Sequence, residues 1–447
     1  MVRVISCGFV DRLFSGQKND PRTHTNKHEI RYLPFRMSTR SVSSGYFLCS
    51  CKVALDPIEG LRYDINVKIA IIGGGIGGLT TALALRHFGF EPEVFERAPE
   101  LLEVGGAIAM WPNALRVALK LGVGEKVIEH AGVIEHIRWQ HRDGKSFNQT
   151  RLPTKAIPAV ALHRADLQSV LLDALPGKSI HLGHAFNSCL QEHDAIRIDF
   201  TSQPSARCDV LIGADGLHSQ LRDQMLNGDA PIYRGYTVWR GITGYAPRGL
   251  EPSTAIEIHG RGQRFGIGPV GNGRIGWWAS ANEKDALERA AANEQQTLLN
   301  LFDEWCAPVG ELISATPAGM ILRNKAFDRA STQSWGLRRM TLLGDAIHPT
   351  TPNLGQGGCM AMEDAAILAR CLAKENDPAR ALRAYEKCRY SRTAAIAGCS
   401  RIYGSIGQWE SRLGTWSRGV MLSIVPKTVT RRLLKLIFDY DAFTVRI

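Results

Sequence analysis

The chain has 447 residues, which is enough for more than one domain with a large apolar core. Its 44% apolar and 22% charged residues are ordinary for a globular protein and argue against a disordered or fibrous chain. The net charge of +11 fits either simple solubility or the attraction of a phosphorylated small-molecule partner. Basic and aromatic residues are not interleaved on any short element, so we expect no nucleic-acid partner.

Three further features bear on the compartment of the protein. No run of eighteen apolar residues occurs, so we expect no integral membrane segment. The ten cysteines form no CxxC pair and predict reduced thiols in a cytoplasmic protein. Residues 1–66 are rich in Arg and Ser and lack any helix or strand period. They predict either an organelle-targeting segment or a disordered extension upstream of the true start, with Met37 as one later start.

The first periodic segment, VKIAIIGGGIGGLTTALALRHFG at 67–89, predicts a buried strand, a glycine turn and a helix. Gly73, Gly75 and Gly78 have GxGxxG spacing, and Glu96 ends the next strand. In this context the glycines let a pyrophosphate approach the backbone at a helix N-terminus, and the acid accepts hydrogen bonds from a ribose. The pattern predicts a cofactor containing ADP and leaves FAD and NAD open.

The rest of the chain consists of a segment rich in short strands and of flanking segments that contain both helices and strands. Between 231 and 280, short strands broken by glycine predict an antiparallel sheet, whereas the flanking segments predict helices and buried strands. The order is therefore a βαβ unit, a β-rich insertion and a return to α/β. Expected helices cover 113–129, 162–175, 282–305, 360–372 and 381–398, and expected strands cover 195–200 and 338–346, with a strand, turn and helix at 208–222.

The segment GDAIHPTTPNLGQGGCMAMEDA, residues 344–365, gathers acidic, His and Cys side chains around a glycine cluster. It suits a metal site, a nucleophile with its base, or a loop that holds a cofactor. Asp345 and His348 have no second His or Cys at metal spacing, and no base is specified near Cys359. We expect Glu363 and Asp364 to favour the N-terminus of the following helix.

Three motifs in this order resemble the single-component FAD-dependent monooxygenases: GGGIGG with Glu96, GADG at 213–216, and LLGDAIHPTTPNLGQGGCMAMEDA. This family includes aromatic hydroxylases, urate hydroxylases and zeaxanthin epoxidases with the p-hydroxybenzoate hydroxylase fold. The resemblance covers residues 67–400 and implies an α/β fold: a Rossmann-like FAD-binding domain, an inserted β-rich substrate domain and C-terminal helices. The implied segments are the extension 1–66, the FAD-binding domain at 67–228 and 326–400, the β-rich substrate domain 229–325 and a C-terminal helical segment 401–447.

The resemblance also implies that the 344–358 loop binds flavin rather than metal. Asp345 would bond to the ribityl chain, and Pro352 and the glycines at 355–358 would bring backbone N–H groups and the positive helix end to the isoalloxazine ring. Arg97 would lie near the adenosine, and Phe186 either near the adenine or in the core. The implied cofactor-binding residues are Gly73, Gly75, Gly77, Gly78, Glu96, Arg97, Ala109, Arg164, Phe186, Asp215, Asp345, Pro352, Gly355, Gln356, Gly357 and Gly358.

The implied reaction is monooxygenation, in which NAD(P)H reduces FAD and O₂ then forms a C4a-hydroperoxyflavin that oxygenates an electron-rich ring or double bond. We expect a small aromatic or heteroaromatic substrate. Arg264 is the predicted catalytic residue, because a guanidinium holds an anionic substrate oxygen well. Trp239, Arg240 and Trp277 are further candidates in the β-rich segment.

Several alternatives stay open at this point. Asn353 and Gly276 stand where the urate hydroxylases have Asp and Tyr, which argues against urate as the substrate. The remaining alternatives are an epoxidase of an alkene or carotenoid, an NAD-dependent dehydrogenase, and a non-catalytic flavin-binding module. The choice between NADH and NADPH and the oligomeric state are also left open.

Overall fold

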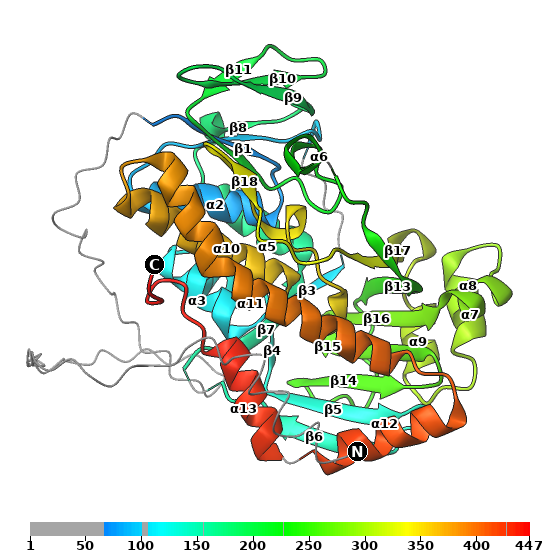
Figure 1. The fold of residues 1–447 in the computed structure, drawn as a ribbon. Helices are drawn as coiled ribbons and strands as arrows, with labels where there is room; N and C mark the ends of the chain where they lie inside the picture. Colours follow the sequence, from blue (N-terminus) through cyan, green and yellow to red (C-terminus); the bar gives the residue numbers. More distant parts are fainter. Residues whose placement is uncertain (1–66, 101–105, 155, 227, 426) are drawn as a thin grey trace, which may run out of the picture. The chain divides into compact units, whose positions relative to one another are not determined.

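The computed structural model describes residues 67–100, 106–154, 156–226, 228–425 and 427–447 (Figure 1). The predictions for residues 1–66 lie outside these ranges.

A six-stranded, mostly parallel sheet forms the nucleotide-binding half of the fold. β1 pairs in parallel with β2 and β12, and β12 pairs in parallel with β19. The IAII sequence of β1 is fully buried, and α2 (Ile76–His87) follows it directly, which confirms the predicted strand–turn–helix unit. The strand order is β18 (Gly336–Leu337), β19 (Met340–Leu342), β12 (Val210–Gly213), β1 (Ile69–Ile72), β2 (Glu93–Phe95) and β8 (Ile180–His181).

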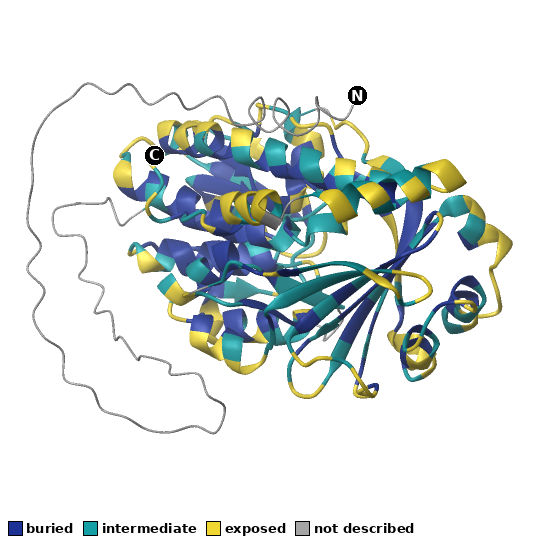
Figure 2. Ribbon diagram, turned by 90° about the horizontal axis from the view of Figure 1, so that it is seen from below, coloured by how far each residue is buried: buried dark blue, intermediate teal, exposed yellow. Residues whose placement is uncertain are grey.

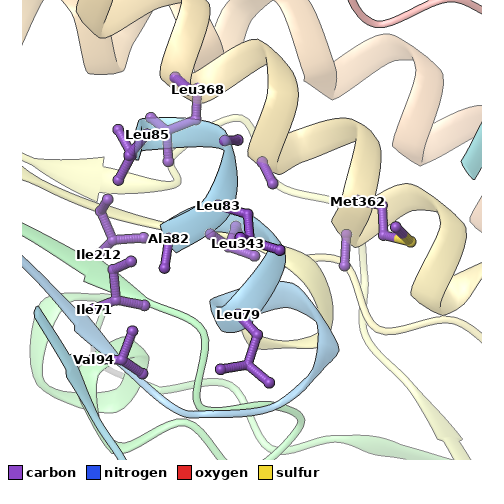
Figure 3. Close-up of a cluster of buried hydrophobic side chains, with 14 of the residues drawn as sticks. Ile71, Leu79, Ala82, Leu83, Leu85, Val94, Ile212, Leu343, Met362 and Leu368 are labelled. Carbon is purple, nitrogen blue, oxygen red and sulfur yellow. The ribbon is translucent and has the colours of Figure 1, made fainter. Parts of the chain in front are cut away.

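The core of this half lies between the sheet and two helices, α2 and α10 (Gly357–Lys374) (Figure 3). Ile71 and Ile212 of the sheet, Leu79 of α2 and Leu368 of α10 are each completely buried. The long helix α11 (Pro378–Gly407) packs along α10 (Figure 1). Figure 2 shows that buried residues fill the interior of this half, whereas exposed residues lie on its outer surface.

A seven-stranded sheet forms the other half. Its neighbouring strands are antiparallel except for β14 and β5, which are parallel. Helices α7 (Glu283–Glu288), α8 (Glu294–Leu301) and α9 (Val309–Ser314) enclose a second core with Trp239 and Trp277. The strand order is β17 (Leu322–Asp328), β13 (Ile232–Thr243), β16 (Ile275–Asn282), β15 (Gln263–Pro269), β14 (Thr254–His259), β5 (His136–His141) and β6 (Ser146–Arg151). β5 and β6 thus belong to this sheet although they lie in the segment 67–228, which we expect to form part of the FAD-binding domain. The domain boundaries stay a prediction.

Two three-stranded sheets and several short elements complete the described chain. One sheet has the order β3 (Ala107–Met110), β7 (Ala159–His163), β4 (Gly132–Ile134), and the other β11 (Ala206–Cys208), β10 (Ile196–Phe200), β9 (Phe186–Gln191). The remaining helices are α6 (Gln220–Leu226), α12 (Arg412–Ile424) and α13 (Lys427–Phe438), with 3₁₀ turns at Gly177–Ser179, Ala318–Met320, Gly344–Ala346 and Pro352–Leu354.

Three expected helices differ from those observed. The helix expected at 113–129 is two helices, α3 (Pro112–Lys120) and α4 (Gly124–Glu129), because Gly122 adopts a φ of +80° between them. α5 (Arg164–Asp173) begins two residues later than expected, after His163, whose ring nitrogen accepts from the Ala165 N–H. The segment 282–305 forms α7 and α8 rather than one helix.

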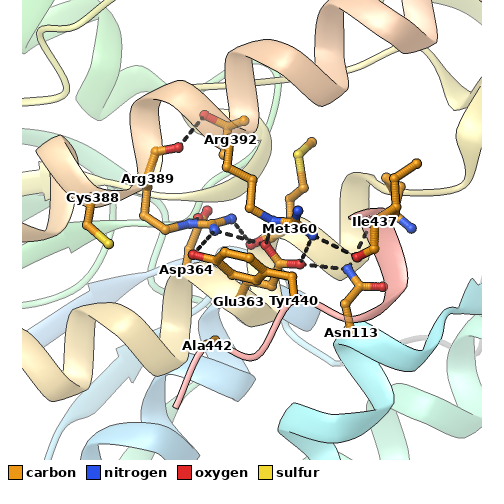
Figure 4. A network of polar contacts seen from close by, with 12 residues as sticks. Asn113, Met360, Glu363, Asp364, Cys388, Arg389, Arg392, Ile437, Tyr440 and Ala442 are labelled. Atoms are coloured by element: carbon orange, nitrogen blue, oxygen red, sulfur yellow. Dashed lines mark hydrogen bonds and ion pairs between the residues drawn. The ribbon is translucent and has the colours of Figure 1, made fainter. Parts of the chain in front are cut away.

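A buried ion network holds α10 in place (Figure 4). Glu363 is completely buried and pairs with Arg389 at 2.8 Å and Arg392 at 2.6 Å, both from α11. Burial by itself raises the pKa of Glu363, but the two arginines outweigh burial and lower the pKa.

Asp364 is the second acid of this network. Its carboxylate pairs with Arg389 at 2.6 Å and His348 at 2.6 Å, and it accepts from the Gly344 N–H at 3.0 Å. Burial raises the pKa of Asp364, but the charges of His348 and Arg389 outweigh burial and lower it to about 2. The prediction that Glu363 and Asp364 favour the helix N-terminus is wrong, because the first turn of α10 contains no acid and both carboxylates bind cations instead.

We expect Arg389→Met to lower the free energy of unfolding by about 3–5 kcal/mol, since it leaves two buried carboxylates with one cation fewer each. Arg380→Met on the same helix is the matched control. Arg380 pairs with Asp377 at the surface, with 77% of its side chain exposed, and its removal should cost about 0–1 kcal/mol. Urea unfolding of both variants measures the difference, and equal losses would contradict the assigned role of Arg389.

Candidate cofactor and substrate site

The glycine turn between β1 and α2 is closely packed against the GADG turn. Gly73 has a φ of +109°, and a Cβ there would lie 2.5 Å from the carbonyl oxygen of Ala214. A Cβ at Gly78 would lie 1.9 Å from the carbonyl oxygen of Gly73. Both positions therefore require glycine, and together they fix the turn that begins α2.

The N-terminus of α2 is open. Gly75 caps the helix without a side-chain hydrogen bond, and the first turn contains no acidic residue. A Cβ at Gly75 would meet only the Arg164 guanidinium, at 4.0 Å. An exposed arginine facing open backbone N–H groups is the arrangement that binds a phosphate or pyrophosphate. Gly77 instead packs toward α10, because a Cβ there would lie 3.4 Å from Ala361 of that helix and 3.0 Å from Leu343 after β19.

The structure brings Glu96 to this turn, as the sequence predicts. Ile72 at the end of β1 pairs with Phe95, so Glu96 follows at the same edge of the sheet. Its carboxylate accepts from the N–H groups of Gly74 at 2.6 Å and Ala98 at 2.9 Å. Arg97 next to it is exposed. The ribose and adenosine contacts of these two residues stay predictions.

The N-terminus of α10 also faces a space. The helix is buried continuously from Cys359 to Ala369, but Gly357 and Gly358 are partly exposed. The turn before the helix starts at the exposed Pro352 and ends at Gly355, with a φ of +60°. The cap residue Gln356 makes no side-chain cap, so the positive end of the helix stays available.

Asp345 faces this helix end. A Cβ at Gly357 would lie 3.7 Å from an Asp345 carboxylate oxygen. The Asp345 residue is exposed, yet surrounding protein raises the pKa of its carboxyl, opposed by the His348 and Arg164 charges. The two observations agree because Asp345 opens into a partly open cavity of about 260 Å³. This cavity is lined by Leu217, Val238, Arg240, Asn324, Lys325, Ala326, Phe327, Asp345, Pro349, Thr350 and Pro352.

Arg240 supplies positive charge to the cavity. Burial lowers the pKa of its guanidinium, and so does the nearby charge of Arg164. One nitrogen donates to Asn324 at 3.2 Å. Two arginines whose charges repel favour an anion between or beside them. The sequence named Arg240 as a candidate but missed Asn324 and Lys325, because nothing in the pattern of β17 separates cavity-lining from exposed positions.

Arg264 occupies a different environment. Its side chain is 1% exposed, and its three nitrogens donate to Gln408, Glu257 and Asn353. Trp278 and Tyr403 lie beside the guanidinium. Among the described residues the cavity wall includes Arg240 and does not include Arg264. The catalytic role of Arg264 stays a prediction.

Ala109 of β3 lies beside the loop that precedes α10. Its carbonyl oxygen accepts from the Cys359 thiol at 3.5 Å, and Trp111 donates to the Leu354 carbonyl oxygen at 3.1 Å. Burial raises the pKa of Cys359 to about 12, which keeps the thiol neutral and argues against a nucleophile. Ala109 and the glycine loop therefore form adjacent walls of one cradle.

Three further residues that the sequence predicts to bind the cofactor are Asp215, Gln356 and Phe186. Asp215 follows β12 next to Gly73, and one of its carboxylate oxygens is buried without a partner. The Nε2 of Gln356 is likewise buried without a partner, although its Oε1 accepts from Asn113 at 3.0 Å. Phe186 is 6% exposed and its side chain lies in the main core, so its backbone contact with the cofactor stays a prediction.

The described residues contain no group of three or more His, Cys, Asp or Glu side chains arranged to hold a metal ion. Within the same residues, no helix has both the length and the apolar character needed to cross a membrane.

We expect Gly357→Val to abolish flavin retention without unfolding the chain. An added Cβ meets its nearest neighbours only at 3.6 and 3.7 Å, so it fits the protein but projects toward Asp345 into the cradle. The control is Gly398→Val in α11, where a Cβ meets nothing within 4 Å. The measurements are the flavin released on denaturation and the thermal unfolding of both variants. A Gly357→Val protein with full flavin content would show that this loop does not hold the cofactor.

Comparisons with known proteins agree with this geometry. The family model for the FAD binding domain matches residues 66–398. The chain is 37% identical to an aurachin C monooxygenase/isomerase of Stigmatella aurantiaca, over 80% of this chain and 94% of the relative. It is 34% identical to an FAD-dependent urate hydroxylase of Klebsiella pneumoniae, over 73% of this chain and 86% of the relative. A chloroplastic zeaxanthin epoxidase of Solanum lycopersicum is 34% identical over 77% of this chain but only 56% of its own length.

A solved structure shows the same fold with its cofactor. The crystal structure of Klebsiella pneumoniae HpxO, complexed with FAD and uric acid, has a TM-score of 0.76 and 29% identity and covers 83% of this chain and 96% of its own.

The cradle in this chain fits FAD. Open N-termini of α2 and α10 suit the pyrophosphate and the reduced ring, and the unpartnered atoms of Asp215 and Gln356 offer polar contacts. The fold, the cradle and the match over most of the chain lead to one conclusion. The chain belongs to the FAD-binding-domain family of FAD-dependent monooxygenases.

Proposed function

We propose that the protein uses NAD(P)H and O₂ to hydroxylate a small, planar aromatic or heteroaromatic substrate that has an ionisable oxygen. The observation that carries the proposal is the cavity beside Asp345, whose wall includes the guanidinium-bearing Arg240. The names of the aurachin C monooxygenase and the urate hydroxylase support the reaction class.

The cavity wall combines apolar surface with one available cation, because the Lys325 ammonium pairs with Glu283 at 2.9 Å. Val238, Phe327 and Pro349 offer flat apolar contacts to a ring, and Arg240 offers a charged donor to an oxygen anion. Its volume of about 260 Å³ is slightly below the roughly 300–1,000 Å³ of pockets for drug-sized ligands, and its wall includes Asp345 and Pro352 of the cofactor cradle, so the remaining space suits a small ring.

Bound FAD would supply the redox chemistry, taking electrons from NAD(P)H and activating O₂. The residues of this chain would orient the partners and exclude water. The positive end of α10 would stabilise negative charge on the reduced cofactor, and Asp345 would hold its polar chain. Arg240 would hold the substrate oxygen as an anion, which makes the ring more electron-rich and fixes which carbon faces the cofactor.

The described packing supports a substrate other than urate. At Gly276, the position where urate hydroxylases have Tyr, an added Cβ would lie 2.6 Å from Val270 and 2.9 Å from Ala107. A tyrosine does not fit there unless the backbone shifts. Asn353 stands where the urate hydroxylases have Asp. It donates to Tyr236 and accepts from Arg264, so it holds its own loop in place.

Epoxidation of an alkene is the second candidate, because the zeaxanthin epoxidase is about as similar as the urate hydroxylase. A screen of phenols, hydroxybenzoates, quinolones, urate and carotenoids separates the two. A true substrate accelerates NAD(P)H oxidation and keeps H₂O₂ low. Coupled turnover with long neutral polyenes alone would replace hydroxylation by epoxidation.

We expect Arg240→Gln to weaken binding of anionic substrates by about 2–5 kcal/mol, with little change in thermal unfolding. Arg264→Gln is the matched comparison. This substitution removes the buried guanidinium that donates to Glu257 and Asn353, and it should therefore lower the melting temperature of the protein. KM, kcat and the melting temperature of both variants give the answer. If Arg264→Gln weakens substrate binding without destabilising the chain while Arg240→Gln has no effect, Arg264 is the substrate anchor and our assignment of Arg240 is incorrect.

Anaerobic stopped-flow mixing with NADPH or NADH tests the redox role itself. We expect at least one of them to bleach the bound flavin, because the family reaction begins with its reduction. A flavin that stays oxidised with both, in the presence of each substrate of the screen, would favour the non-catalytic flavin-binding module. A colourless protein that takes up NAD but no FAD would favour the dehydrogenase.

A further inference from the structure

Helix α12 has an exposed apolar stripe on one face. Leu413, Trp416, Val420 and Ile424 follow each other at intervals of three or four residues, which places them on one side of a helix. Their exposed fractions are 73%, 65%, 38% and 60%. A tryptophan and a leucine this exposed on one stripe are unusual for a surface that only meets water.

The opposite face of α12 is fixed to the protein, so the stripe does not turn inward. Arg418 is 4% exposed and donates to the carbonyl oxygens of Gly407 and Gly260. Asn148 of β6 donates to the Leu422 carbonyl oxygen at 2.8 Å. Figure 1 shows α12 lying beside β6.

Helix α13 also has exposed apolar residues on one face. Val429, Leu433 and Leu436 are exposed and share one face by their spacing. The other side is held by Phe438, whose ring stacks on Trp111 with the centroids 5.1 Å apart. We call the exposed residues Leu413, Trp416, Val420, Ile424, Val429, Leu433 and Leu436 the apolar strip.

The charged residues of the segment that forms the apolar strip have one sign. The sequence from Arg412 to Phe438 contains no Asp or Glu. The nearest acids are Glu410 and Asp439 at the two ends. Exposed cations beside the strip are Arg412, Arg431, Arg432 and Lys435.

We propose that the apolar strip binds the surface of an anionic lipid bilayer. The helices have 13 and 12 residues and are therefore about 20 Å long, which is too short to cross a hydrocarbon core of about 30 Å. They would lie in the interface with the apolar side chains among the acyl chains and the cations at the phosphates, a position in which tryptophan is also favoured.

The charge distribution favours a bilayer over a second copy of the chain. A two-fold contact through the strip would bring the same cations from both copies toward each other without an acid between Arg412 and Phe438 to neutralise them. An anionic lipid surface neutralises them all.

Flotation of the full-length, FAD-loaded protein with vesicles tests the proposal. We expect binding to phosphatidylcholine vesicles that contain phosphatidylserine, and binding weaker by about tenfold or more to phosphatidylcholine alone or at high salt. Trp416→Ser with Ile424→Ser should reduce binding by about tenfold or more. Arg431→Gln with Arg432→Gln should weaken binding only to the anionic vesicles.

The control is Leu190→Ser with Leu287→Ser, which removes two leucines that are 53% and 63% exposed outside the strip. The control should bind like the wild type, and flavin content and melting temperature should be unchanged in all variants that are compared. The proposal is overturned if the wild type does not float with anionic vesicles, or if the control loses binding as much as the strip variant. Self-association that the strip variant abolishes, without lipid binding by the wild type, would identify the strip as a contact between copies.

Discussion

The structure depends on the burial of two adjacent carboxylates in α10. Glu363 and Asp364 are stable as anions inside the protein only because Arg389, Arg392 and His348 approach them closely. This requirement fixes α10 against α11 and against the turn at Gly344. The N-terminus of α10 is thereby held beside Asp345, so that a network built on two completely buried carboxylates determines where the cofactor cradle lies.

Helix α11 extends this constraint to the other half of the molecule. Ser400 of α11 joins the helix to the loop before α10. Its carbonyl oxygen accepts a hydrogen bond from Asn353, and its hydroxyl donates to the Thr351 carbonyl oxygen at 2.7 Å. Asn353 also accepts from Arg264 of β15, and Arg264 donates to Gln408 just after α11. The loop at the cofactor and the sheet that lines the cavity are therefore joined through α11, which suits a reaction that needs ring and substrate in fixed positions.

The sequence predicts what is local and misses what is distant. The turn at Gly73–Gly78 and the position of Glu96 follow from a pattern within 30 residues, so the βαβ unit and the cradle could be anticipated. The pairing of β5 with β14 joins residues more than a hundred positions apart and leaves no periodic signal. The roles of Glu363 and Arg264 depend in the same way on distant partners that no spacing rule identifies. Glu363 accepts from Asn113, which is 250 positions away, and Arg264 donates to Gln408, which is 144 positions away.

One cradle, formed by the N-termini of α2 and α10, would hold the flavin with its ring beside the Arg240 cavity. A crystal structure of the FAD-loaded chain would decide this. We expect the pyrophosphate between Gly75 and Arg164, the ribityl chain at Asp345 and the ring edge at Gly357 and Gly358. A flavin bound outside this cradle, or a ring that does not border the cavity, would show that the proposed cradle is wrong.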